Sequence, residues 1–348
     1  MIDPSTDGPR DFGFNARETL AFVLDSTPPP GFTQYWSRWR DIVWSKPATL
    51  SPATSEAHTR HGATHVVASL GDVQVGCRVS GAAPGSARGV VITSHGYGPP
   101  DTPMDDRDPW TSRDGMAVIK VRLRGFPGSD VETGDLTAAP YGHICTGLEG
   151  DDPMLTWAVS GSVADLLNVF RAARLLYGRE IPISIHGESY GGGIGVVAAS
   201  QIFGDDHVHR LALGVPTLGG WRWRLEQRVT AGAGWDMARF IESHPALRER
   251  TTELLALFDA VVHARRVVCP VLCKLALRDE VVPAPTAAAV FNALGSDPGR
   301  KWRFVTDYGH FDGGMDDLRR HVEFERLIGE FLDPARRARD IMRKYTGG

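Results

Sequence analysis

The sequence is poor in cysteine and has no long apolar run. Four of its 348 residues are cysteine, at positions 77, 145, 269 and 273, too few for a disulfide framework. Cys269 and Cys273 fall on one predicted strand, where four residues span roughly 13 Å, but a disulfide needs Cα atoms less than about 7 Å apart. No apolar run is long enough for a membrane span, and the first residues lack the basic and apolar regions of a signal peptide. We therefore expect a cytoplasmic protein with reduced thiols and no membrane partner.

The sequence also has no large excess of positive or negative charge. The formal net charge is −4, and charged residues make up 23% of the chain, which is ordinary for a globular protein. Such a balance gives no reason to expect a nucleic acid or an anionic membrane as a partner.

Two kinds of ligand motif are missing. No Gly-x-x-x-x-Gly-Lys-Ser/Thr sequence occurs, and Val196 stands where a dinucleotide-binding loop starting at Gly191 needs its third Gly or Ala. His207 and His209 could ligate a metal, but no cluster of cysteines or carboxylates accompanies them. We therefore expect neither a nucleotide cofactor nor a metal.

What the sequence does contain is an alternation of short apolar runs and helical segments. Continuous runs of Val, Ile and Leu are typical of strands buried on both faces of a parallel sheet. They occur at residues 90–93, 117–121, 181–185, 211–215, 271–277 and 302–305. Their alternation with helices predicts an α/β fold with a mostly parallel, doubly wound sheet.

Other segments depart from this pattern. Residues 1–62 predict an N-terminal arm, with a helix near 16–24 and a loop at 46–62, packed on a catalytic domain of residues 63–348. Two strands are expected around the turn Gly71-Asp72. Residues 216–267 are helical in pattern throughout, so we expect a cap-like helical insertion over the carboxyl edge of the sheet.

The stretch HGESYGGG, residues 186–193, lies between an apolar run and a helix of small residues. Its glycines would let a strand and a helix approach closely. The pattern Gly-x-Ser-x-Gly at such a turn is also the nucleophile elbow of α/β-hydrolases. We predict that Ser189 is a catalytic nucleophile.

An activated serine needs a histidine base and an acid that orients it, in the order Ser, acid, His along an α/β-hydrolase chain. Asp279 directly follows one predicted strand and His310 follows the next, where ligands bind in such sheets. Ser189, Asp279 and His310 are therefore the predicted triad. The alternatives are Glu280 or Asp312 as the acid, and His321 or His263 as the base.

An oxyanion hole requires two backbone N–H groups. One would come from Tyr190, directly after the nucleophile. The other would come from the turn His95-Gly96-Tyr97-Gly98, which follows an earlier strand. Tyr97 is the preferred donor there and Gly98 the alternative.

From about residue 30 to residue 332 the chain resembles the acetyl xylan esterase and cephalosporin-C deacetylase family of α/β-hydrolases. The resemblance rests on the motifs PPGFTQYW, HGYGPP, VRLRGFPGSD, GHICTGLEGDDP, GESYGGG and YGHF, and on the segment around Asp279. It implies the same triad and the same two oxyanion donors. It also implies removal of small acyl groups, chiefly acetyl, from alcohols or sugars without a cofactor, and assembly into a homo-oligomer, commonly a hexamer.

The chain departs from that family's pattern at three positions. Phe126, Tyr190 and Phe311 stand where the family has Gln, Gln and Glu. Phe126, Phe311 and Trp221 are predicted walls of a substrate pocket that would favour an apolar alcohol. We therefore predict a serine carboxylesterase acting on a small-molecule ester. The alternatives are a thioesterase, an amidase, a peptidase of the prolyl-oligopeptidase kind, or a non-catalytic ligand-binding protein.

Overall fold

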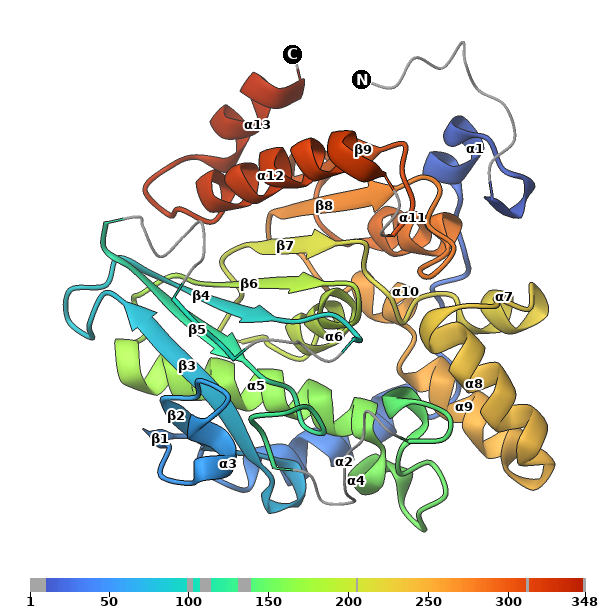
Figure 1. Cartoon of the computed structure of the whole chain (residues 1–348), viewed down its shortest axis with the longest axis horizontal. Helices are drawn as coiled ribbons and strands as arrows, with labels where there is room; N and C mark the ends of the chain where they lie inside the picture. Colours follow the sequence, from blue (N-terminus) through green and yellow to red (C-terminus); the bar gives the residue numbers. More distant parts are fainter. Residues whose placement is uncertain are drawn as a thin grey trace.

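The computed structural model describes residues 11–98, 103–106, 114–130, 139–204, 206–310 and 313–346. Its centre is a nine-stranded sheet in the order β1-β2-β3-β5-β4-β6-β7-β8-β9 (Figure 1). The strands are β1 Leu50–Pro52, β2 His65–Ala68, β3 Gln74–Gly81, β4 Gly89–Ser94, β5 Met116–Val121, β6 Ile183–Glu188, β7 Leu211–Gly214, β8 Val271–Ala276 and β9 Lys301–Thr306. Neighbours from β5 to β9 in this order are parallel, and β1, β2, β3 and β5 pair antiparallel.

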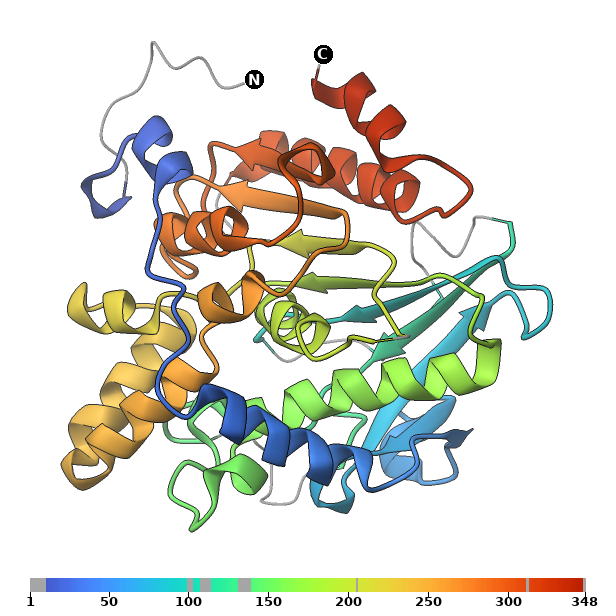
Figure 2. The same ribbon diagram turned by 180° about the vertical axis from the view of Figure 1, so that it is seen from behind.

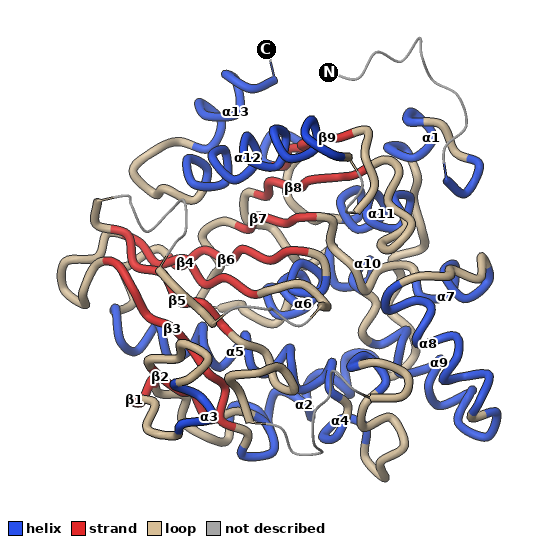
Figure 3. Tube along the Cα trace, viewed as in Figure 1, coloured by secondary structure: helices blue, strands red, loops and turns tan. Residues whose placement is uncertain are grey.

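All six apolar runs coincide with the parallel strands β4 to β9, so the predicted fold class is confirmed (Figure 3). The main shift is in β6, which starts at Ile183 and extends to Glu188. The two strands predicted around Gly71-Asp72 are β2 and β3. Residues 46–62 were expected to be a loop, but they contain β1 and α3.

Helices cover both faces of the sheet (Figures 1 and 2). They are α1 Ala16–Ala21, α2 Phe32–Trp44, α3 Glu56–Thr59, α4 Pro153–Thr156, α5 Ala158–Tyr177, α6 Tyr190–Ala199, α7 Trp221–Glu226, α8 Gly232–Ser243, α9 Arg248–Leu257, α10 Ala260–Ala264, α11 Ala284–Ala293, α12 Gly314–Phe331 and α13 Ala338–Thr346. Side chains alternate along each strand, so Val91 and Leu272 pack with α12 and α13. Val90 and Cys273 belong to the larger cluster with α5, α6 and α11.

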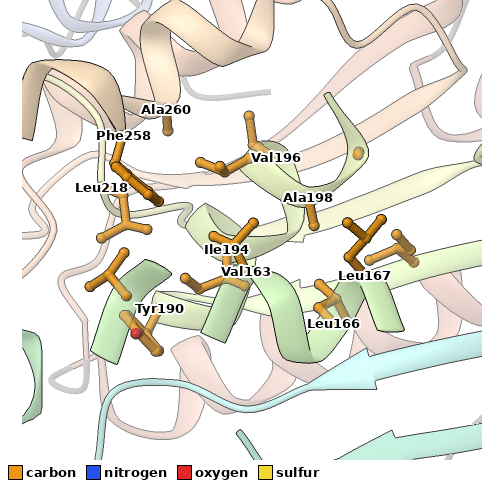
Figure 4. Packing of buried hydrophobic residues seen from close by; sticks show 14 of the residues in the cluster. Val163, Leu166, Leu167, Tyr190, Ile194, Val196, Ala198, Leu218, Phe258 and Ala260 are labelled. Carbon is orange, nitrogen blue, oxygen red and sulfur yellow. The ribbon is translucent and has the colours of Figure 1, made fainter. Parts of the chain in front are cut away.

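The larger cluster fixes the helix that follows Ser189. Val163 of α5 lies beside Ile194 of α6, and Leu167 and Tyr190 belong to the same cluster (Figure 4). All of these side chains are buried. The start of α6 therefore sits on a close-packed support.

The first sixty residues are tied to the body of the protein. Trp36 and Trp39 of α2 are fully buried. The Trp36 indole donates to the Leu257 carbonyl at 3.0 Å, and that of Trp39 donates to Ser160 Oγ at 2.9 Å. Helix α2 is therefore fixed to the body of the protein, while the division into an arm of residues 1–62 and a catalytic domain of residues 63–348 stays a prediction.

The segment between β7 and β8 carries α7, α8, α9 and α10, where the helical insertion was predicted. Figure 1 shows α7, α8 and α9 beyond the ends of the central strands. All four cysteines are free. No helix within the described ranges is both long and apolar enough to cross a membrane.

Candidate active site

Ser189 stands at a sharp turn between β6 and α6. Its backbone has φ 50° and ψ −107°, an uncommon conformation for a residue with a side chain and one that often marks functional sites. The Ser189 N–H donates to the Gly214 carbonyl at 2.7 Å, and its own carbonyl accepts from the Gly193 N–H at 3.0 Å. These bonds hold the strained turn in place.

The glycines of this stretch permit close backbone contacts. A Cβ on Gly187 would lie 2.3 Å from the Gly191 carbonyl oxygen, and one on Gly193 would lie 2.4 Å from the Thr217 carbonyl oxygen. Neither distance is possible for a real side chain. The two interpretations of HGESYGGG, packing and chemistry, are therefore compatible, because the glycines let the turn form and the turn carries Ser189.

Asp279 and His310 lie close together in the loops that follow the neighbouring strands β8 and β9. Asp279 lies three residues after β8 and His310 four residues after β9. His310 Nδ1 is 2.7 Å from Asp279 Oδ2. The other oxygen, Asp279 Oδ1, accepts from the N–H groups of Val281 and Val282 at 3.0 and 2.8 Å. This arrangement fixes an Nδ1–H tautomer and leaves Nε2 as the basic nitrogen.

The alternative bases have different surroundings. His263 is fully buried, and its ring nitrogens contact Ser200 Oγ at 2.7 Å and the Leu257 carbonyl at 2.9 Å. Burial lowers its pKa to about 3. His321 on α12 lines the same pocket as Ser189, and the hydrogen bond to Glu325 raises its pKa. Among the alternative acids, Glu280 is exposed and Asp312 lies outside the described residues.

The turn that follows β4 lies against Ser189. A Cβ on Gly96 would be 3.7 Å from Ser189 Cβ, and the His95 carbonyl accepts from the Gly191 N–H at 3.0 Å. Tyr190 is the first residue of α6, so its N–H has no partner within that helix. The side chains of Tyr97 and Tyr190 meet edge to face, with ring centroids 5.7 Å apart.

A pocket of about 910 Å³ joins these elements. Its lining includes Ser189, His310, Gly96, Tyr97 and Gly98. An apolar part of the wall consists of Val215, Ala233, Val281 and Val282. An ionisable part consists of Glu188, Lys274, Asp317 and His321.

Sequence reasoning missed the ionisable wall. Burial alone would raise the pKa of Glu188, but the hydrogen bond from His186 and nearby positive charges hold it below the usual value. The His186 Nε2 to Glu188 Oε1 distance is 3.4 Å. The available signal was a charged residue in each of two central strands, Glu188 at the end of β6 and Lys274 within β8.

The predicted aromatic walls do not line this pocket where the structure describes them. Phe126 is buried between the rings of His95 and His143, with centroids 4.5 and 4.6 Å away. Trp221 is buried beside the Arg224 guanidinium. Both are core residues because their large apolar surfaces are better buried between helices and loops. Phe311 lies outside the described residues. Among residues with a described placement, no group of three His, Cys, Asp or Glu could hold a metal ion.

Comparisons with known proteins place the chain in a family. The family model of acetyl xylan esterase (AXE1) matches residues 24–326. Acetyl xylan esterase 1 from Thermoanaerobacterium sp. JW/SL YS485 superposes with a TM-score of 0.69 at 20% identity, over 90% of this chain and 98% of the other. The acetyl xylan esterase from Paenibacillus sp. R4 gives a TM-score of 0.69 at 19% identity, over 90% and 99%.

A third solved structure shares the fold but belongs to a longer chain. The acylaminoacyl peptidase of Pyrococcus horikoshii superposes with a TM-score of 0.55 at 16% identity, over 87% of this chain and 45% of that one. No curated protein matches the sequence. Since the family model spans most of the chain, the protein belongs to the acetyl xylan esterase (AXE1) family of serine esterases with the α/β-hydrolase fold.

Proposed function

We propose that the protein removes small acyl groups, chiefly acetyl, from an alcohol or sugar ester, and that Ser189, His310 and Asp279 are its triad. The observation that carries the proposal is the 2.7 Å contact between His310 and Asp279 in a pocket whose wall also contains Ser189 at its strained turn. Membership of the esterase family supports the reaction class.

In this mechanism Ser189 Oγ attacks the ester carbonyl and its proton passes to His310 Nε2. Asp279 stabilises the resulting imidazolium. The backbone N–H groups of Tyr97 and Tyr190 bind the oxyanion, and loss of one such donor typically costs about 3–4 kcal/mol. His310 then protonates the departing alcohol, and activates a water molecule that releases the acid and restores Ser189.

The pocket supports a polar alcohol in place of the apolar one expected from its predicted aromatic walls. Glu188, Lys274 and His321 provide hydrogen-bonding and charged groups in the wall of the pocket that also contains Ser189. A hydroxyl-rich alcohol can exchange its bound water for such groups, while an apolar alcohol would displace water from them without replacing its hydrogen bonds. This assignment of the ionisable wall to the alcohol is part of the proposal.

The test compares wild type, Ser189→Ala and Ser86→Ala on p-nitrophenyl acetate, butyrate and octanoate. Ser86 is exposed, so its variant controls for serine replacement. We expect highest kcat/KM with acetate and loss of activity only in Ser189→Ala. Preference for octanoate would reject the acetyl assignment. Equal inactivity of wild type and Ser189→Ala would reject the esterase mechanism and turn attention to thioesters, amides and peptides.

A further inference from the structure

The two tyrosines that supply the proposed oxyanion donors are anchored by one short segment. This segment is the 3-10 turn η5, His143–Cys145. The Ile144 N–H donates to Tyr97 Oη at 3.0 Å, and His143 Nε2 is 3.2 Å from Tyr190 Oη. The Tyr190 hydroxyl also donates to Ser162 Oγ at 3.1 Å.

The backbone N–H groups of the two tyrosines are fixed in different ways. Tyr190 begins α6, and the helix itself sets the direction of its N–H. Tyr97 lies between Gly96 and Gly98 in an irregular turn, where the glycines leave the backbone many accessible conformations. The side chain of Tyr97 is therefore an important constraint on the direction of its N–H.

The Tyr97 hydroxyl has a single proton, and its direction can be assigned. Because its oxygen accepts from the Ile144 N–H, the proton is directed to Asp236 Oδ2, 2.9 Å away. Asp236 lies on α8, in the helical segment between β7 and β8. A hydrogen bond to a carboxylate is shorter and stronger than one between neutral groups.

This contact is enclosed by the backbone of Gly142. A Cβ on Gly142 would lie 2.3 Å from both Tyr97 Oη and Asp236 Oδ2, and the residue has φ +71°. Only glycine fits there without displacing the pair. The Gly142 backbone therefore packs against both the Tyr97 hydroxyl and the Asp236 carboxylate.

We propose that Asp236 is a positioning residue, which through the Tyr97 hydroxyl directs the Tyr97 N–H toward the oxyanion formed at Ser189. This inference rests on the proposed esterase function. Through the hydrogen bond between Asp236 and the Tyr97 hydroxyl, the helical insertion would influence the backbone N–H that binds the oxyanion. An incorrectly directed donor weakens binding of the oxyanion, which exists only after attack, and leaves binding of the ester largely unchanged.

The test measures kcat and KM with p-nitrophenyl acetate for Tyr97→Phe, Asp236→Ala, Asp236→Asn and the double variant Tyr97→Phe/Asp236→Ala. Glu242→Gln removes an exposed carboxylate from the same helix and is the matched control. We expect Tyr97→Phe and Asp236→Ala each to lower kcat roughly tenfold, less than the 10²–10³ typical of deleting a donor, with KM within about twofold. The double variant should be no slower than the slower single variant, because both remove one bond. Asp236→Asn, which keeps an acceptor, should recover most of the activity.

Several outcomes would overturn the inference. The inference is wrong if both single variants keep the wild-type kcat, or if their effects on kcat multiply in the double variant. It is also wrong if the variants raise KM and leave kcat unchanged. Thermal unfolding and titration of active sites with a fluorophosphonate identify variants that fail to fold, and Tyr97→Phe, which removes one oxygen atom, is the variant least exposed to that failure. If Ser189→Ala keeps wild-type activity, the proposed function fails; if only Ser189→Ala is inactive, the function stands and the role of Asp236 fails.

Discussion

Asp279 uses its two carboxylate oxygens for two different tasks. Oδ1 accepts from the backbone at Val281 and Val282, and Oδ2 contacts His310 Nδ1. The backbone bonds hold the carboxylate in one orientation within a buried site. The residue therefore both fixes the loop after β8 and selects the tautomer of His310.

From this arrangement we predict that Asp279→Asn lowers kcat by about 10⁴, as expected when the base is held in the wrong tautomer. The amide oxygen would keep the two backbone bonds and the NH₂ group would face His310. His310 Nδ1 would then be the acceptor, and the proton on Nε2 would prevent it from acting as base. Steady-state kinetics with p-nitrophenyl acetate measure the effect.

Glu280→Gln is the control for that experiment, since Glu280 is the exposed neighbour that could have served as the acid. We expect near wild-type kcat for this variant. A large loss in Glu280→Gln together with an active Asp279→Asn would reverse the assignment of the acid.

The proposed triad could be assembled from the sequence because the order of its residues and their positions after strands follow from the mechanism; its catalytic role stays a prediction. The pocket walls could not. Phe126 and Trp221 are large aromatic residues. The sequence alone does not distinguish an aromatic side chain in the core from one in a pocket wall. Glu188, Lys274 and His321 come from three separate elements, so their common position depends on strand order and on the placement of α12.

At the scale of elements, the parallel strands were predictable because strands buried on both faces are continuous apolar runs. Residues 50–52 and 56–59 were not, since a three-residue strand and a four-residue helix are too short for a periodic pattern. The strand β1 at the sheet edge also contains Pro52, a residue that weakens strand prediction but is tolerated at an edge.

The loop after β5 is held to α5 by a buried ion pair. Arg124 Nη2 lies 2.7 Å from Asp165 Oδ1, and both side chains are almost fully buried. Asp165 Oδ2 also accepts from the Arg124 backbone N–H at 3.0 Å. Removing one member of such a pair leaves an uncompensated charge in the interior.

We predict that Asp165→Ala lowers the free energy of unfolding by about 3–5 kcal/mol, the range typical of breaking a buried pair. Urea denaturation followed by circular dichroism measures this change. Arg38→Gln breaks the exposed pair with Asp152, whose side chains are 62% and 36% accessible, and should cost less than about 1 kcal/mol. Equal, small effects in both variants would contradict the buried-pair argument.

At the scale of the whole molecule, desolvation keeps the imidazoles of His95, His143 and His263 neutral at pH 7. Burial lowers the pKa of His95 to about 4 and the pKa values of His143 and His263 to about 3. They come from the turn after β4, the η5 turn and helix α10. In the unfolded chain each would titrate near its ordinary value of 6.5.

We therefore predict that the folded state loses stability as the pH falls below about 6.5. Between the unfolded and folded pKa values the unfolded chain binds more protons, so its free energy falls relative to the folded state. Each histidine contributes up to about 1.4 kcal/mol per pH unit in this window. The raised pKa of His321, caused by its bond to Glu325, acts in the opposite sense. Urea unfolding at pH 7 and pH 5 measures the difference.

Single replacements separate the histidines from other titrating groups. His263→Gln removes one buried imidazole, so its loss of unfolding free energy between pH 7 and pH 5 should be smaller than that of wild type by about 1–2 kcal/mol. His207 is exposed, so His207→Gln should lose as much as wild type. If His263→Gln and wild type lose the same amount, the acid sensitivity arises elsewhere. If only His263→Gln is less sensitive, burial of a neutral histidine in the packed core explains its share of the pH dependence.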